Sequence, residues 1–194
     1  MKKFAIIITN IVFKLFFKVE LIDLHKIPSE GPALLCANHN NMLDMFLLGY
    51  RLDRWIYWMA KEELFKNAVS AFIYRKLGAF PVKRGAGDVG SVKNAYKLLE
   101  SGKIVGIFPQ GTRIDPSKID TIKVKSGAAM IAVNTGVPII PAAVLGNYKL
   151  FSRMKVVFGD PFIIENTDKK YTKEDLSELS RDILKRIYSL AEGR

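Results

Sequence analysis

The chain has 194 residues, of which 49% are hydrophobic and 25% charged, a size and composition that fit about one domain and exclude a disordered chain. Its 30 basic and 19 acidic residues give a net charge of +11, so the surface attracts the phosphates of lipids, nucleic acids or small anions. The single cysteine, Cys36, excludes an internal disulfide, and its apolar neighbours favour a buried, unreactive side chain.

The N-terminal segment is apolar but too short to span a bilayer. The charge-free run covers only Phe4–Phe13, whereas a membrane-spanning helix needs about 20 residues. No small-residue cleavage site of a signal peptide follows it. As a helix, the segment places Asn10, Lys14 and Lys18 in one polar stripe. We expect residues 1–22 to be an amphipathic segment lying on an anionic membrane, although packing against the core or a second chain would give the same pattern.

The remaining residues, 23–194, alternate between strand-like and helix-like patterns. Apolar runs predict strands at Ala33–Ala37, Trp55–Met59, Ala79–Val82, Ile104–Phe108, Ile139–Val144 and Met154–Phe158. Other patterns predict helices at Leu43–Leu52, Glu62–Leu77, Val89–Ser101, Ser126–Thr135 and Thr172–Ala191. The last helix begins with an approximate capping box, Thr172 and Asp175. This alternation predicts a single α/β domain with a mostly parallel, buried sheet flanked by helices.

The loop after the first predicted strand contains His39, with Asp44 five residues later. Active sites of parallel sheets lie at such strand ends. On one helix these two side chains would point about 140° apart, so they can meet only if His39 precedes the helix and Asp44 lies in its first turn. Asn40 or Asn41 would then cap the helix. In that arrangement Asp44 orients the imidazole as a general base, but spacing alone also fits a loop histidine and an aspartate that offsets the helix dipole.

Two further strand ends carry residues suited to phosphate. Lys83 and Arg84 follow the third predicted strand and precede a glycine-rich turn that opens a helix, where free N–H groups favour anions. After the fourth strand, Gly111 permits a tight turn, and Thr112 and Arg113 can bind phosphate oxygens. Each loop taken alone is also typical of an ordinary surface turn.

Together and in this order, these segments resemble the glycerolipid acyltransferase family, in particular its members that acylate 1-acylglycerol 3-phosphate. The family's first motif, NHxxxxD, matches NHNNMLD at residues 38–44 fully. The other three motifs resemble GAFPVKR at residues 78–84, FPQGTR at residues 108–113 and VPIIPAAV at residues 137–144. Gln110 departs from the glutamate that is usual in the third motif, which makes a strict need for a carboxylate there doubtful. The resemblance covers about residues 25–145.

The resemblance implies transfer of a fatty acyl group from an acyl-carrier protein or CoA thioester to the free hydroxyl of lysophosphatidic acid, giving phosphatidic acid. It implies that His39 is the general base, that Asp44 orients it, and that no acyl-enzyme forms. It also implies a set of residues for the acceptor phosphate and its loop: Lys83, Arg84, Gln110, Gly111, Thr112 and Arg113.

We accordingly expect no metal, no cofactor other than the thioester co-substrate, and no nucleic-acid partner. The location expected is the cytoplasmic face of the cell membrane, as a peripheral or monotopic protein. The same chemistry on glycerol 3-phosphate, another lysophospholipid or an aminoacyl lipid remains open. A non-catalytic basic module that binds lipid or nucleic acid would explain the charge, but it leaves the spacing of His39 and Asp44 unexplained.

Overall fold

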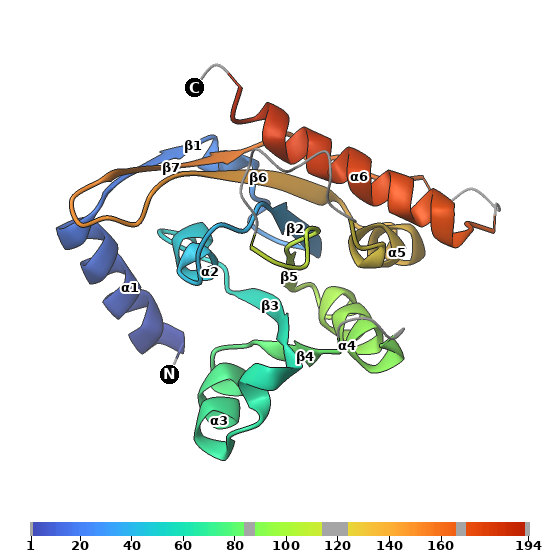
Figure 1. Ribbon diagram of the computed structural model, residues 1–194, viewed down its shortest axis with the longest axis horizontal. Coiled ribbons are helices and arrows are strands. Elements are labelled where there is room, and N and C mark those ends of the chain that lie inside the picture. The colour runs from blue at the N-terminus through green and yellow to red at the C-terminus, as the bar shows by residue number, and fades with distance from the viewer. Residues whose placement is uncertain (1, 84–87, 114–123, 166–169, 193–194) are drawn as a thin grey trace.

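The structure, a computed structural model, describes residues 2–83, 88–113, 124–165 and 170–192. Within these ranges, seven strands form one sheet in the order β1-β7-β6-β2-β5-β3-β4 (Figure 1). The strands are β1 (Lys18–Ile22), β2 (Ala33–Ala37), β3 (Ile56–Lys61), β4 (Phe80–Val82), β5 (Ile104–Ile107), β6 (Ile139–Gly146) and β7 (Arg153–Phe158). Neighbouring strands are parallel, except that β6 and β7 pair antiparallel. The prediction of a mostly parallel sheet is therefore confirmed.

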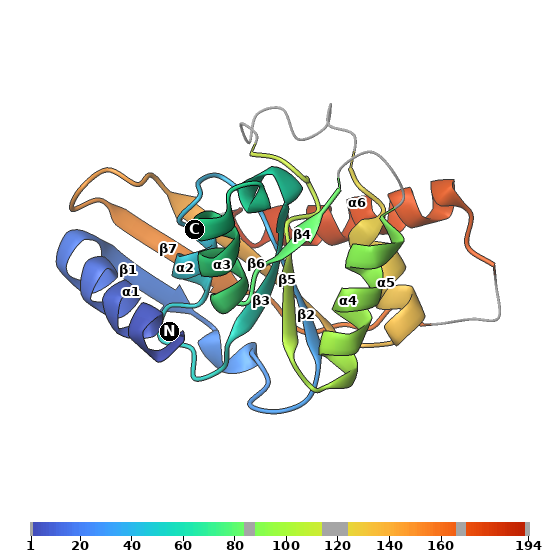
Figure 2. The same ribbon diagram turned by 90° about the horizontal axis from the view of Figure 1, so that it is seen from below.

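Helices cover both faces of this sheet (Figures 1 and 2). On one face lie α1 (Lys2–Phe16) and α2 (Asp44–Leu48), and on the other lie α4 (Val89–Glu100), α5 (Gly127–Thr135) and α6 (Lys173–Ser189). The helix α3 (Ala68–Lys76) lies between β3 and β4 in the chain, and short 3-10 turns occupy η1 (Leu24–Lys26) and η2 (Glu62–Phe65). None of the helices in the described ranges is long and apolar enough to cross a bilayer.

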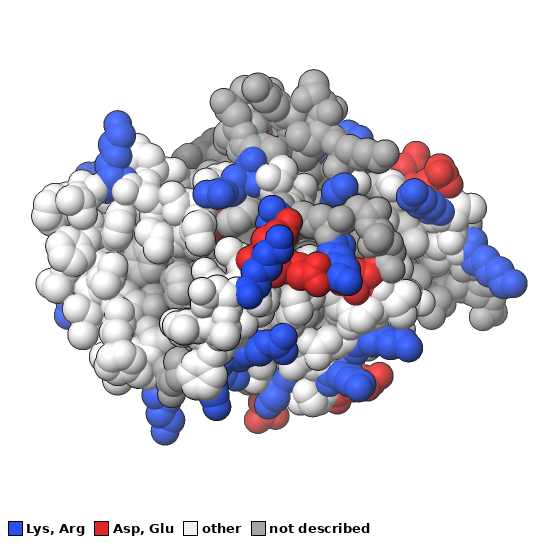
Figure 3. Space-filling view, turned by 60° about the horizontal axis from the view of Figure 1, so that its bottom comes forward, with Lys and Arg blue, Asp and Glu red and all other residues white. Residues whose placement is uncertain are grey.

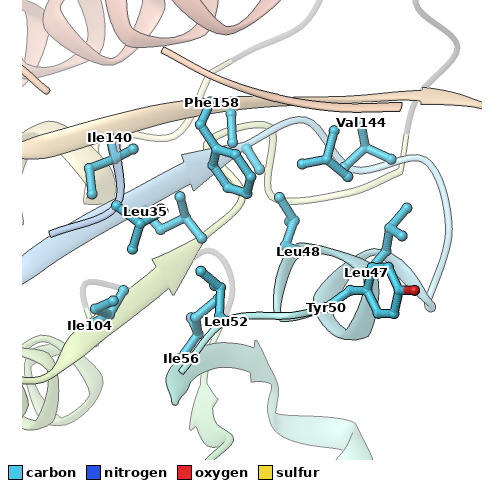
Figure 4. Packing of buried hydrophobic residues seen from close by; sticks show 14 of the residues in the cluster. Leu35, Leu47, Leu48, Tyr50, Leu52, Ile56, Ile104, Ile140, Val144 and Phe158 are labelled. Carbon is cyan, nitrogen blue, oxygen red and sulfur yellow. The ribbon is translucent and has the colours of Figure 1, made fainter. Parts of the chain in front are cut away.

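The central strand β2 is buried along its whole length because helices cover it on both sides. Leu35 packs with the side chains of α1 and α2, whereas Leu34 and Cys36 pack with those of α4, α5 and α6. Figure 4 shows Leu35 and Leu48 in the first of these two cores. Burial raises the pKa of the Cys36 thiol far above its ordinary value, so the thiol stays protonated and unreactive, as the sequence indicated.

The first strand, β1, lies within residues 1–22, the segment predicted to be amphipathic and membrane-associating. Residues 18–22 pair in parallel with β7, and α1 already ends at Phe16. Lys18 is therefore not part of the helix, and Asn10 lines an inward pocket with its Oδ1 buried. The predicted polar stripe is wrong because α1 buries Phe13 in the core and turns Asn10 inward with it.

Two predicted helices are shorter in the structure. The expected helix Glu62–Leu77 is divided at Asn67, whose extended backbone lets its side chain accept the N–H groups of Val69 and Ser70 and start α3 anew. The helix expected at Leu43–Leu52 ends at Leu48. The capping box at Thr172 and Asp175 is confirmed, with both reciprocal hydrogen bonds present.

The strand order determines which loops meet. Because β6, β2, β5, β3 and β4 all run parallel, their carboxyl ends lie at one edge of the sheet. The loop after β2 is flanked there by the loop after β6 on one side and the loop after β5 on the other. The residues that follow these three strands can therefore contact one another despite their separation in the chain, which is 71 positions for His39 and Gln110 and 104 for Asp44 and Tyr148.

Candidate active site

A fully buried carboxylate, Asp44, organises the loop after β2. Its Oδ2 accepts hydrogen bonds from His39 Nδ1 at 2.8 Å and from the backbone N–H groups of Asn40 and Asn41 at 2.6 and 2.7 Å. Its Oδ1 accepts the hydroxyl of Tyr148 at 2.6 Å. These four donors offset the cost of burying a charge, which would be several kcal/mol for an unpaired ion.

This arrangement confirms the predicted placement of the pair. His39 lies in the loop, and Asp44 is the first residue of α2. The predicted cap is wrong: the N-cap is Leu43, which has no capping side-chain bond, while Asn41 Oδ1 accepts the Leu43 N–H at 3.1 Å. The backbone N–H groups of Asn40 and Asn41 donate to Asp44. The carboxylate of Asp44 therefore stabilises the turn before α2 in place of an asparagine cap.

One imidazole nitrogen of His39 is bonded to Asp44, and the other has no hydrogen-bond partner among the residues that the structure describes. Because Nδ1 donates to the Asp44 carboxylate, Nε2 carries the lone pair of the neutral ring. The ring stacks on Phe108 with a centroid distance of 4.0 Å, and Phe108 stacks on Trp58 at 4.7 Å. Gly106 leaves room for this stack of three rings, because a Cβ at position 106 would lie 2.5 Å from the Trp58 ring. The aromatic stack and the carboxylate together fix the plane of the imidazole.

Two asparagines tie the same loop to β6. Asn38 donates from Nδ2 to the Val144 carbonyl at 2.9 Å and accepts the Val144 N–H at 2.6 Å, so its side chain continues the pairing of β2 with β6. Asn40 Nδ2 donates to the same carbonyl at 3.1 Å. Sequence reasoning gave neither residue this role. A buried asparagine directly after a strand was the available signal, because its amide can imitate a peptide group.

Gln110 connects the loop after β5 to the histidine loop. It is buried, its Oε1 accepts the His39 backbone N–H at 2.6 Å, and its Nε2 donates to the Tyr188 hydroxyl at 2.6 Å. Both ends of its amide are therefore bonded to protein groups. Burial raises the pKa of Tyr188, so this hydroxyl keeps its proton and could donate to a carboxylate at position 110.

The predicted phosphate residues near β4 are only partly described. Lys83 lies at the end of β4 with its Nζ 3.8 Å from Glu62, an exposed pair of little energetic weight. Arg84 lies outside the described residues. The N-cap of α4 is Asp88, which accepts the Ser91 N–H at 3.1 Å and the Lys83 N–H at 2.7 Å, the contact that contributes most to lowering its pKa. A carboxylate thus occupies the helix start where we expected a phosphate.

The loop after β5 presents Thr112 and Arg113 on the surface. Gly111 has φ +67°, a left-handed conformation that glycine adopts without strain, and a Cβ there would lie 3.1 Å from the stem of Lys125. The Lys125 N–H donates to the Pro109 carbonyl at 3.2 Å. Lys125 is therefore a further cation at this loop, and no local sequence pattern marks it because it lies a dozen positions downstream.

The fold and the site define the class of the protein: an α/β protein with a carboxylate-held histidine at the carboxyl edge of a parallel sheet. Residues 18–145 match the family model described as Acyltransferase. The chain belongs to this acyltransferase family.

Similar proteins agree with this assignment. The chain is 32% identical to a 1-acyl-sn-glycerol-3-phosphate acyltransferase of Bacillus subtilis, over 98% of this chain and 96% of that protein. It is 29% identical to a chloroplastic 1-acyl-sn-glycerol-3-phosphate acyltransferase of Arabidopsis thaliana, over 70% of this chain and 38% of that one. Its fold matches the crystal structure of the 1-acyl-sn-glycerophosphate acyltransferase PlsC of Thermotoga maritima with a TM-score of 0.72 and 24% identity, over 99% of this chain and 80% of that one.

The two bonds of Gln110 generate a prediction about stability. Gln110→Ala leaves the partly buried His39 N–H without its partner, so we expect the free energy of unfolding to fall by about 1–3 kcal/mol. Gln110→Glu keeps the acceptor for His39, and Tyr188 can donate to the new carboxylate, so this variant should lose much less. Urea denaturation of both variants measures the difference, and equal losses would show that the amide of Gln110 does not hold the two loops together.

Proposed function

We propose that the protein is a 1-acyl-sn-glycerol-3-phosphate O-acyltransferase. It transfers a fatty acyl group from an acyl-carrier protein or CoA thioester to the free hydroxyl of lysophosphatidic acid, giving phosphatidic acid. The observation that carries the proposal is the 2.8 Å bond between His39 Nδ1 and buried Asp44 in a member of the acyltransferase family. The names of the relatives from Bacillus and Arabidopsis support the choice of acceptor.

In the proposed reaction, His39 acts as the general base. Its Nε2 takes the proton of the acceptor hydroxyl as the oxygen attacks the thioester carbonyl, and Asp44 stabilises the imidazolium that forms. The tetrahedral intermediate then collapses, the carbon–sulfur bond breaks, and the leaving thiolate takes the proton back from Nε2. The products are the new ester and a free thiol. Only side chains and the two substrates take part in these steps.

The acceptor phosphate is assigned to cations around the loops after β5 and β4. Arg113 is exposed after β5 and can bind phosphate oxygens in a bidentate manner. Lys83 directly follows β4, which lies two strand spacings, about 10 Å, from β5, a distance that long side chains can reduce. Lys125 adds a third cation beside Gly111. Arg84, next to Lys83 in the sequence, is assigned to the same phosphate on the family resemblance.

An apolar pocket suits the acyl chain. It lies between α1, α2, β3 and α3 and opens to solvent. Trp58 and Met45 are among its lining residues, and Trp58 stacks on the Phe108 ring that carries His39. The acyl chain in the pocket would thus contact Trp58 at one end of the stack, and the imidazole of His39 lies at the other end.

The membrane partner is assigned to an apolar surface on α1 and the loop between β6 and β7. Exposed apolar side chains gather on it: Phe4, Ile7, Ile8, Ile11, Leu15, Phe16, Leu150 and Phe151. The Phe151 N–H bonds the Phe16 carbonyl, so the two parts are continuous. In Figure 3 this side of the molecule, at the left, is largely free of charged residues. Apolar surface of this extent is typical of a membrane contact.

The location proposed for the protein is the cytoplasmic face of the membrane, where acyl thioesters would reach it. The net charge of +11 suits both an anionic leaflet and an acidic acyl-carrier protein. Transfer to glycerol 3-phosphate, another lysophospholipid or an aminoacyl lipid uses the same site, and a panel of acceptors separates these reactions.

His39→Ala tests the base. We expect thiol release from an acyl thioester with lysophosphatidate to fall by about 10²–10⁴ or more, because general-base action is lost. The exposed histidine at position 25 provides the control, since His25→Ala removes an imidazole at η1 and should keep the wild-type rate. Normal release by His39→Ala would refute the assignment. Salt-sensitive DNA binding by a wild-type protein that releases no thiol would instead favour a non-catalytic basic module.

Arg113→Ala tests the phosphate site. Loss of a charge-assisted hydrogen bond at an exposed position should raise the KM for lysophosphatidate by about tenfold and leave kcat nearly unchanged. Arg181→Ala removes another exposed cation, on α6, and should change neither constant. An unchanged acceptor KM in Arg113→Ala would contradict the role given to Arg113.

The double variant Ile7→Ser, Ile11→Ser tests the membrane surface. Moving one exposed isoleucine side chain from water into an apolar medium is favourable by roughly 1.5–3 kcal/mol of free energy. The variant should therefore bind phosphatidylglycerol vesicles more than tenfold more weakly in a sedimentation assay. The control Ile163→Ser removes an exposed isoleucine near the amino end of β6, at the opposite edge of the sheet. If the double variant sediments like the wild type, α1 is not the membrane contact.

A further inference from the structure

Tyr148, in the loop between β6 and β7, contacts Oδ1 of Asp44, the carboxylate oxygen that does not bind His39. Its hydroxyl lies 2.6 Å from Oδ1, whereas His39 and two backbone amides all bind Oδ2. The side chain reaches Asp44 from 104 positions along the chain because β6 lies beside β2 in the sheet. Tyr148 is thus the one side chain among the described residues that approaches this carboxylate opposite the imidazole.

The direction of this hydrogen bond is fixed by chemistry. Burial and the nearby charge of Asp44 raise the pKa of Tyr148 far above its ordinary value. A raised tyrosine pKa means that the hydroxyl is protonated at every pH at which an acyl thioester would be assayed. Tyr148 therefore donates, and the Asp44 carboxylate accepts.

The ring of Tyr148 is held in place by the end of the N-terminal helix. Phe17 meets it edge-on with a centroid distance of 6.0 Å, and Phe17 in turn packs against Phe13 of α1 at 5.5 Å. Phe13 is buried and also contacts Tyr50. The hydroxyl consequently has little freedom to leave Asp44.

We propose that Tyr148 is a positioning residue for the His39–Asp44 pair. Its hydrogen bond fixes the plane of the Asp44 carboxylate so that Oδ2 faces His39 Nδ1, and it stabilises the carboxylate against rotation about its terminal bond. Tyr148 acts through Asp44 and does not touch the reacting groups. The catalytic part of this inference rests on the proposed acyl transfer, but the geometric part concerns the His39–Asp44 bond alone.

Tyr148→Phe removes only the hydroxyl. Loss of a hydrogen bond to a charged group that positions the base should lower kcat for thiol release by about tenfold, with the KM of both substrates within about twofold. Tyr50→Phe is the matched control, because Tyr50 packs on Phe13 in the same aromatic group and makes no hydrogen bond to Asp44 within the described part of the chain. It should keep the wild-type kcat. A wild-type kcat in Tyr148→Phe would overturn the proposal.

A second readout does not depend on activity. The chain has only two histidines, so imidazole ¹⁵N spectra of the full-length protein are assigned with His25→Ala. The Nδ1–H signal of His39 reports its bond to Asp44, and we expect it to broaden or move in Tyr148→Phe but not in Tyr50→Phe. An unchanged signal would overturn the proposal, as would a fall in kcat explained by unfolding at the assay temperature. If the wild type transferred no acyl group, the proposed function would fail, and this spectrum would still decide the role of Tyr148.

Discussion

The candidate site depends on one physical constraint: a carboxylate that is completely removed from water must have its hydrogen bonds supplied by the protein. Asp44 receives four, from the imidazole, two consecutive backbone amides and a tyrosine. To provide two amides at one oxygen, the chain after Asn38 has to fold tightly around Asp44. The conformation of the loop, the tautomer of His39 and the direction of its free nitrogen all follow from satisfying this buried charge.

The sheet supplies what the loop cannot supply alone. The neighbour β6 contributes the Val144 backbone that binds Asn38 and Asn40, and the loop that follows it contributes Tyr148. The loop after the other neighbour, β5, contributes Phe108, which stacks on the imidazole, and Gln110, which bonds the His39 backbone. A histidine loop in any other position of the sheet would lack one of these two sets of contacts. The order β6-β2-β5 is therefore a requirement of the site as well as of the core.

The sequence predicted the parts of the fold whose signals are local. Buried strands such as β2 read as apolar runs, and the five-residue spacing of His39 and Asp44 allowed one geometry, which the structure has. The strand β1 was missed because its short, charged pattern continues an apolar helix and becomes a strand only by pairing with β7. Tyr148 and Lys125 were missed for a similar reason, since no local pattern marks a residue whose partner is distant along the chain.

The pairing of β1 with β7 also has a consequence for the order of events during synthesis. Lys18 lies opposite Arg153, so this edge of the sheet cannot form until most of the chain has left the ribosome. By then α1, with its outward isoleucines and phenylalanines, has long been available to a nearby bilayer. If α1 binds the membrane as proposed above, the sheet would be completed beside a helix already in contact with lipid. A truncated chain lacking β7 would then keep this helix while leaving β1 unpaired.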